Sequence, residues 1–162
     1  MFKIKLSILL LVSLFFFSCT NNQVKLPSQK YSLAYIGGGF DGLLLKNYLV
    51  SYLKNLDMYD SNSDYEIRTN INHNSNLFIT NIDNTSDRER INTQVSFQIM
   101  NTIANCQILN DEISVSQFYI YASSDKFLSN QIAAREIKKN NTDAIVRQFI
   151  NKLKNISDKC DD

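Results

Sequence analysis

Apolar and polar positions alternate in several stretches of the chain, a pattern typical of strands with one buried face. A polar segment at 73–76 is expected to bulge or interrupt the second stretch, and a bulge is expected at 110–112 in the last one. The charged segment 83–90 is predicted to connect two strands, and 102–105 is predicted to be a turn. The alternating stretches are residues 31–36, 65–82, 95–99 and 106–122.

Two other segments repeat their apolar residues at intervals of three and four, as helices with one buried face do. The first is expected to begin at Asp41, a candidate N-cap. The second lies near the C-terminus, where Leu128 and Ile132 extend its apolar face upstream and the polar run 138–141 lies on a solvated face or divides the helix. The clearest apolar positions are Leu45, Tyr48, Leu49, Tyr52, Leu53 and Leu56 in the first helix, and Ile145, Phe149, Leu153 and Ile156 in the second.

The predicted order of elements is therefore β, α, β, β, β, α. Each helix has one apolar face to cover and the half-buried sheet needs one cover, so the pattern predicts an α+β fold. We expect a two-layer sandwich with a mostly antiparallel sheet and both helices on one face. Residues 31–157 form this single domain, and 158–162 form a polar tail.

The N-terminus has a different pattern, a short basic start followed by an apolar run that ends at Cys19. This composition is typical of a secretory signal, and the run 8–17 is shorter than the about 20 apolar residues that span a bilayer. The segment resembles the lipobox of bacterial lipoproteins, in which the cysteine is lipidated and becomes the new N-terminus. We therefore expect a signal peptide at 1–18 and a lipidated tether at 19–30, with an ordinary secretory signal or a retained anchor as the alternatives.

Removal of this signal would take two lysines and change the formal net charge from +1 to −1. A chain so close to neutrality has no overall attraction for nucleic acid. An oxidising compartment would allow a disulfide between Cys106 and Cys160, although we expect two unpaired thiols, one in a half-buried strand and one in a frayed tail. Because His73 is the only histidine and no Cys-x-x-Cys is present, no metal site is expected.

The segment 37–42 has the Gly-x-Gly-x-x-Gly spacing between a predicted strand and a predicted helix, the context of a dinucleotide fingerprint. Glycines there let a backbone approach a pyrophosphate at a helix N-terminus. However, the chain is short for the remaining parallel strands, and Asp60 and Asp64 precede the second strand instead of ending it. A flexible strand-to-helix turn is the preferred interpretation, with dinucleotide binding through Gly37 to Gly42 kept as an alternative.

No catalytic constellation stands out in the sequence. His73 lies in an asparagine-rich segment and is expected to be a solvated loop histidine. The paired carboxylates Asp111 and Glu112 occupy a turn-like position. We therefore expect no enzymatic activity and no cofactor.

The order of elements and several local segments resemble those of the LPS-assembly lipoprotein family (LptE). The resemblance extends over the whole chain after Cys19, and it lies in the order of the segments more than in any one of them. The segments that carry it are 47–53, 65–67, 87–90, 95–99, 114–121, 143–144 and 149–153.

This resemblance implies a lipid-anchored, periplasm-facing protein of the outer membrane that acts as a plug and assembly partner of the barrel protein LptD during lipopolysaccharide transport. Polar side chains on the outer faces of the strands would suit a polar barrel lumen. Arg88, Arg90 and Lys126 are candidate contacts for lipid A phosphates, with ordinary solvated charge as the other interpretation. An auxiliary or scaffolding lipoprotein of another envelope transport complex remains an alternative.

Overall fold

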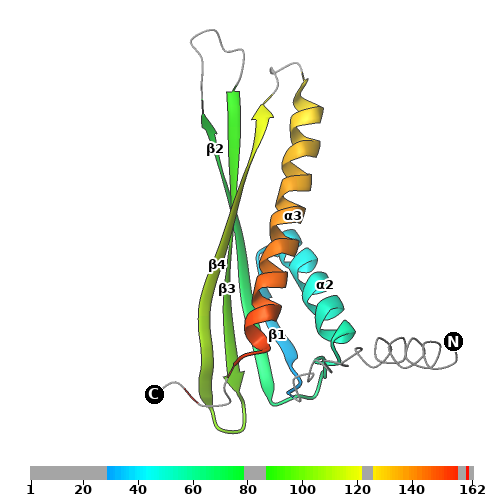
Figure 1. Cartoon of the computed structure of the whole chain (residues 1–162), viewed down its shortest axis with the longest axis vertical. Coiled ribbons are helices and arrows are strands. Elements are labelled where there is room, and N and C mark those ends of the chain that lie inside the picture. Colours follow the sequence, from blue (N-terminus) through cyan, green and yellow to red (C-terminus); the bar gives the residue numbers. More distant parts are fainter. Residues whose placement is uncertain (1–28, 79–86, 122–125, 157–159, 161–162) are drawn as a thin grey trace, which may run out of the picture.

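The structure is a computed structural model that describes residues 29–78, 87–121, 126–156 and 160. The predicted signal peptide, Cys19 and most of the tether lie outside these residues. The described chain has the predicted order of elements (Figure 1). They are β1 (Ser32–Gly37), α2 (Gly39–Asn55), β2 (Tyr65–Phe78), β3 (Asp87–Asn101), β4 (Cys106–Tyr121) and α3 (Phe127–Leu153).

The strands form one sheet in the order β1-β2-β3-β4, and both helices cover the same face of it (Figure 1). β1 is parallel to β2, whereas the other two pairings are antiparallel. The predicted α+β class is therefore confirmed. Below, the distal end of the sheet is the end where β2 stops and β3 starts, and the proximal end holds the turn between β3 and β4.

The apolar core lies at the proximal end, where α2 and α3 both pack on the inner face of the sheet. Alternate residues of β3 point inward and are buried, which is why the sequence pattern has a period of two. The rings of Phe97 and Phe149 stack there with their centroids 3.9 Å apart, joining β3 to α3. Leu45, Leu49 and Leu53, one turn apart on α2, are fully buried, as their spacing predicted.

The strands are more regular than expected, and β3 is longer. β2 pairs with β3 without interruption through 73–76, so the bulge predicted there is absent. The register of β3 and β4 shifts between Ile99 and Met100, away from the predicted bulge at 110–112. β3 already begins at Asp87, so Arg88 and Arg90 belong to a strand and the prediction that they lie in a connection is wrong.

The helices also differ from expectation at their first turns. α2 begins at Gly39 with Gly38 as its N-cap, and Asp41 lies in the first turn instead of capping it. α3 is one unbroken helix through 138–141. The prediction that Leu128 and Ile132 belong to the buried face is wrong, because these residues are 68% and 60% exposed.

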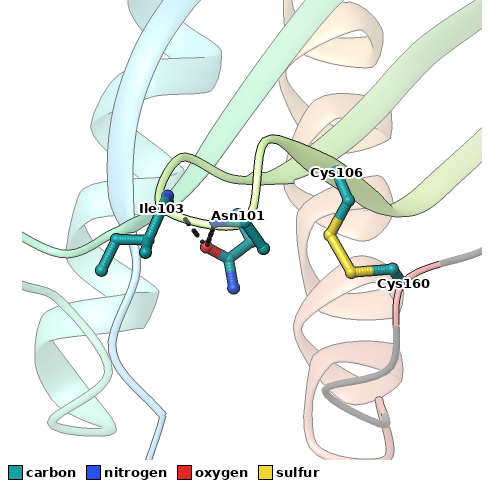
Figure 2. Close-up of a disulfide and its surroundings, with 5 residues drawn as sticks. Asn101, Ile103, Cys106 and Cys160 are labelled. Carbon is teal, nitrogen blue, oxygen red and sulfur yellow. Dashed lines mark hydrogen bonds between the residues drawn. A yellow bond between two sulfur atoms is a disulfide. The ribbon is translucent and has the colours of Figure 1, made fainter.

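The proximal end carries a disulfide between Cys106 and Cys160 (Figure 2). The two Cα atoms are 5.8 Å apart, within the normal range for this bond. Our expectation of unpaired thiols was therefore wrong, because the end of α3 returns the C-terminal segment to the start of β4. Beside the bond, the Asn101 side-chain oxygen accepts from the backbone N–H groups of Ile103 and Ala104, both at 3.0 Å, and shapes the predicted turn (Figure 2).

Candidate functional site

The distal end of the outer sheet face, opposite the helices, carries a cluster of basic and apolar side chains. Directly paired residues of antiparallel strands point to the same side of a sheet. Arg88 pairs with Phe78 on one side and Ile120 on the other, and Arg90 pairs with Phe118. We call these five residues the distal cluster.

Aromatic contacts hold the distal cluster together. The Arg90 guanidinium lies over the Phe78 ring, 5.3 Å from its centroid, and the Phe78 and Phe118 rings are 6.0 Å apart. Phe118 and Ile120 remain 57% and 72% exposed. Arg88 is exposed, and the Nε of Arg90 is buried without a hydrogen-bond partner among the described residues.

Such an arrangement suits a ligand that is both anionic and apolar. Arginine binds phosphate and carboxylate oxygens through directed N–H groups, and an exposed apolar patch of this kind marks a contact surface. Lys126, the third predicted basic contact, is not part of this cluster. It precedes the first turn of α3, the helix on the inner face of the sheet. The structure therefore unites Arg88 with Arg90 and separates Lys126 from them.

Sequence reasoning missed the apolar members of the distal cluster. In β4, Phe118 and Ile120 interrupt an otherwise polar outward series. The available signal was that the apolar residues of this strand shift from odd-numbered positions to even-numbered ones at Phe118. The shift became informative only after the strand pairing had placed these residues beside the arginines.

Amide and hydroxyl side chains cover most of the remaining outer face, together with the charged residues Glu66, Arg68 and Glu112. This observation confirms the prediction that the strands present polar residues outward. Ser116 donates from its hydroxyl to the side-chain oxygen of Asn92 across 2.8 Å, so neighbouring strands are linked on this face. Its outward residues include Asn70, Asn72, Asn74, Asn92, Gln94, Ser96, Ser114 and Ser116.

A buried polar cluster lies on the inner face between the two helices. His73 belongs to β2 and only 4% of its side chain is exposed, so the prediction of a solvated loop histidine is wrong. Its Nδ1 is 2.8 Å from the Thr93 hydroxyl oxygen, and its Nε2 is 3.6 Å from Asp41 Oδ2. Burial lowers the pKa of His73 below its usual value; the nearby Asp41 carboxylate acts in the opposite direction, and Lys138 lowers the pKa further. The cluster therefore favours a neutral imidazole.

The glycine segment serves packing between β1, α2 and β2. These elements do form a parallel unit, the context that a dinucleotide fingerprint requires. However, a Cβ on Gly38 would lie 2.4 Å from a methyl carbon of Ile71, and one on Gly42 would lie 2.6 Å from the carbonyl oxygen of Gly37. Close packing therefore accounts for Gly38 and Gly42, and Asp41 adds negative charge to the first helical turn.

Two further properties bear on function. Among the described residues, no group of three or more histidine, cysteine, aspartate or glutamate side chains could hold a metal ion. In the same part of the chain, the helices lack the combination of length and hydrophobicity that crossing a membrane requires.

Comparisons with known proteins identify the fold. No protein-family model matches the sequence, and no curated protein matches it. The structure is similar to a minor lipoprotein from Acinetobacter baumannii, with a TM-score of 0.59 and 17% identity over 80% of this chain and 93% of that chain. It is also similar to the rare lipoprotein B from Shewanella oneidensis, with a TM-score of 0.55 and 11% identity over 78% of this chain and 98% of that chain. At these identities the likeness establishes a shared fold: this chain has the fold of these bacterial lipoproteins.

Proposed function

We propose that this protein is an outer-membrane lipoprotein that acts as plug and assembly partner of the LptD barrel in lipopolysaccharide transport. The observation that carries the proposal is the polar outer face of the sheet, which spans three strands and ends in the distal cluster. The lumen of an outer-membrane barrel is polar, so a plug that fits it needs a surface of hydrogen-bonding side chains. The fold shared with bacterial lipoproteins and the lipobox-like segment before Cys19 support the same proposal.

In addition to the contact with the barrel, the distal cluster provides a contact for lipopolysaccharide. Lipid A combines phosphate groups with acyl chains, and the cluster combines Arg88 and Arg90 with exposed aromatic and aliphatic side chains. The exposed guanidinium of Arg88 is available for a phosphate, and the Phe118 and Ile120 side chains offer an apolar surface beside it. We assign the lipopolysaccharide contact to Arg88 and Arg90; Lys126 is a separate candidate.

The test is co-purification of the full chain with LptD from detergent-solubilised outer membranes. Asn72→Glu places a charge in the middle of the outer face, and Asn47→Glu places the same charge on the exposed side of α2. We expect the first variant to lose most of the bound barrel protein and the second to retain it. Recovery of the wild-type chain as a free monomer, with normal surface lipopolysaccharide after depletion, would contradict the proposal.

A further inference from the structure

The two helices leave one part of α3 without a covering element. α2 begins only at Gly39, midway along the sheet, and runs to the proximal end (Figure 1). Where the helices meet, Tyr52 of α2 donates from its hydroxyl to Asp143 of α3 across 2.9 Å. Upstream of that contact, Leu128 and Ile132 of α3 are largely exposed. The distal half of α3 therefore presents apolar side chains that no described element covers.

A hollow lies beside this uncovered part of α3. It has a volume of about 490 Å³ and lies between the first turn of α2 and the distal half of α3. Gln131, Arg135 and Lys138 follow at intervals of four and three, so they share one face of α3. Phe40 lies on the other side of the hollow and is 83% exposed. The lining residues are Phe40, Asp41, Gln131, Ala134, Arg135 and Lys138.

The charges around the hollow are predominantly positive. Neither Arg135 nor Lys138 has an ion-pair partner among the residues that the structure describes, whereas Lys139 lies 3.8 Å from Glu136. Asp41 is the acidic residue of the lining, and its carboxylate lies 3.6 Å from His73. Two cations therefore remain available to an incoming ligand, next to exposed apolar side chains.

We propose that the uncovered face of α3, together with the hollow beside Phe40, is the docking site for an acidic amphipathic helix of another envelope protein. Such a helix would insert apolar side chains between Phe40 and Ile132 and place carboxylates near Arg135 and Lys138, as in helix-in-groove recognition. The occupant is a helix because a hollow between two helix surfaces accepts side-chain knobs, whereas a flat bilayer surface would leave it empty. The uncovered part of α3 from Phe127 to Lys138 accommodates about 18 Å of helix.

The proposal goes beyond the role assigned to the outer sheet face, because it concerns the opposite side of the molecule. A photoreactive benzoylphenylalanine at position 132 of the full chain, in intact cells, tests it. The crosslinked peptide is then identified by mass spectrometry. We expect a segment with apolar residues at helical spacing and more acidic than basic residues. The same probe at Asn55, exposed at the proximal end of α2 and outside both proposed contact surfaces, serves as the control.

The decisive step is a charge exchange. Arg135→Glu together with Lys138→Glu should reduce the adduct at least fivefold, and replacing the acidic residues of the crosslinked segment by lysine should restore it. Lys46→Glu with Lys154→Glu changes the charge equally at exposed positions elsewhere and should leave the adduct intact. Four results would each overturn the proposal. They are an adduct with phospholipid or lipopolysaccharide alone, a segment without an excess of acidic residues, no adduct above the Asn55 level, and no effect of the Arg135 and Lys138 reversal. If the variant with Arg135 and Lys138 reversed still binds LptD, the loss of the adduct is independent of the proposed plug role.

Discussion

The side-chain amide of Asn141 on α3 donates to the hydroxyl oxygen of Thr93 on β3 across 3.1 Å. The same nitrogen lies 3.3 Å from the carbonyl oxygens of Ile91 and Val115, so one buried side chain connects α3 to two strands. Both Asn141 and Thr93 are fully buried. Polar groups in such a position hold the helix in place only while they are paired, because an unpaired buried group is costly.

Asn141→Ala is expected to lower the free energy of unfolding by about 2 to 3 kcal/mol, because it empties a buried volume and leaves polar groups of β3 and β4 unpaired. Urea denaturation followed by circular dichroism measures the effect. Asn140→Ala, at the adjacent exposed position of α3, should change the stability by less than about 0.5 kcal/mol. Equal effects of the two substitutions would show that the buried amide has no special role.

Acidification should destabilise the fold through His73. Burial lowers its pKa in the folded protein below the usual 6.5, so the folded state binds fewer protons than the unfolded state. The contribution of the neutral ring is full above pH 6.5 and is lost as the pH falls from 6.5 toward the folded pKa. We expect the loss of stability between pH 7.5 and pH 5 to be smaller in His73→Gln than in the wild type. Since His73 is the only histidine, a nuclear magnetic resonance titration of its ring reports this pKa directly.

Reduction of the Cys106–Cys160 disulfide should weaken the proximal end. The bond closes a loop between residues 54 positions apart, for which loss of the crosslink typically costs about 2 to 4 kcal/mol. Thermal unfolding with and without a reductant measures the effect. In Cys160→Ser the reductant should have no further influence on the melting temperature. An unchanged melting temperature of the reduced wild type would indicate that the bond adds nothing to stability.

The glycines of the strand-to-helix turn should differ in their tolerance of a side chain. Gly38 has φ 106° and no room for a Cβ next to Ile71, so Gly38→Ala should cost more than about 2 kcal/mol. Gly39 has φ 58° and open space around its Cα, so Gly39→Ala should cost about 1 to 2 kcal/mol. Comparison of the two unfolding curves checks this order. A reversed order would remove the packing explanation for Gly38.

Charge reversal in the distal cluster should weaken binding to lipid A without unfolding the protein. Arg88→Glu with Arg90→Glu removes both guanidinium groups and is expected to reduce binding at least tenfold. Lys46→Glu with Lys154→Glu changes the net charge equally and should have little effect. Binding to immobilised lipid A at fixed salt compares the three proteins. Equal losses in both double variants would point to general electrostatic attraction.

The sequence predicted the order of elements because the inward and outward positions of these strands and helices differ clearly in polarity. The sequence-based prediction failed where polar residues are buried or apolar residues are exposed. His73 and Asn141 look like solvent-exposed residues within polar segments, yet tertiary contacts with Thr93 bury both of them. Leu128 and Ile132 look like core residues because their spacing is helical, but α2 does not extend far enough to cover them.

The candidate site was predictable only in part. Arg88 and Arg90 were identified as basic residues near a strand end, and the pairing of β3 with its neighbours then placed them among aromatic side chains. The alternation of β4 could have indicated Phe118 as an outward apolar residue. The hollow beside Phe40 had no sequence signal, because it results from the relative lengths and positions of two helices.

The buried residues on the inner face of α3 are polar in its distal and middle turns and apolar in its proximal turns. This difference affects which part of the helix can separate from the sheet. Its distal turns bury Asn130 and its middle buries Asn141, whereas its proximal turns bury Phe149 and Leu153. Separation of the distal turns would expose mainly groups that water can satisfy, while separation of the proximal turns would expose core side chains. Backbone amides in the first turns of α3 should therefore exchange with deuterium through local opening, and those beyond Ile145 only when the whole domain unfolds.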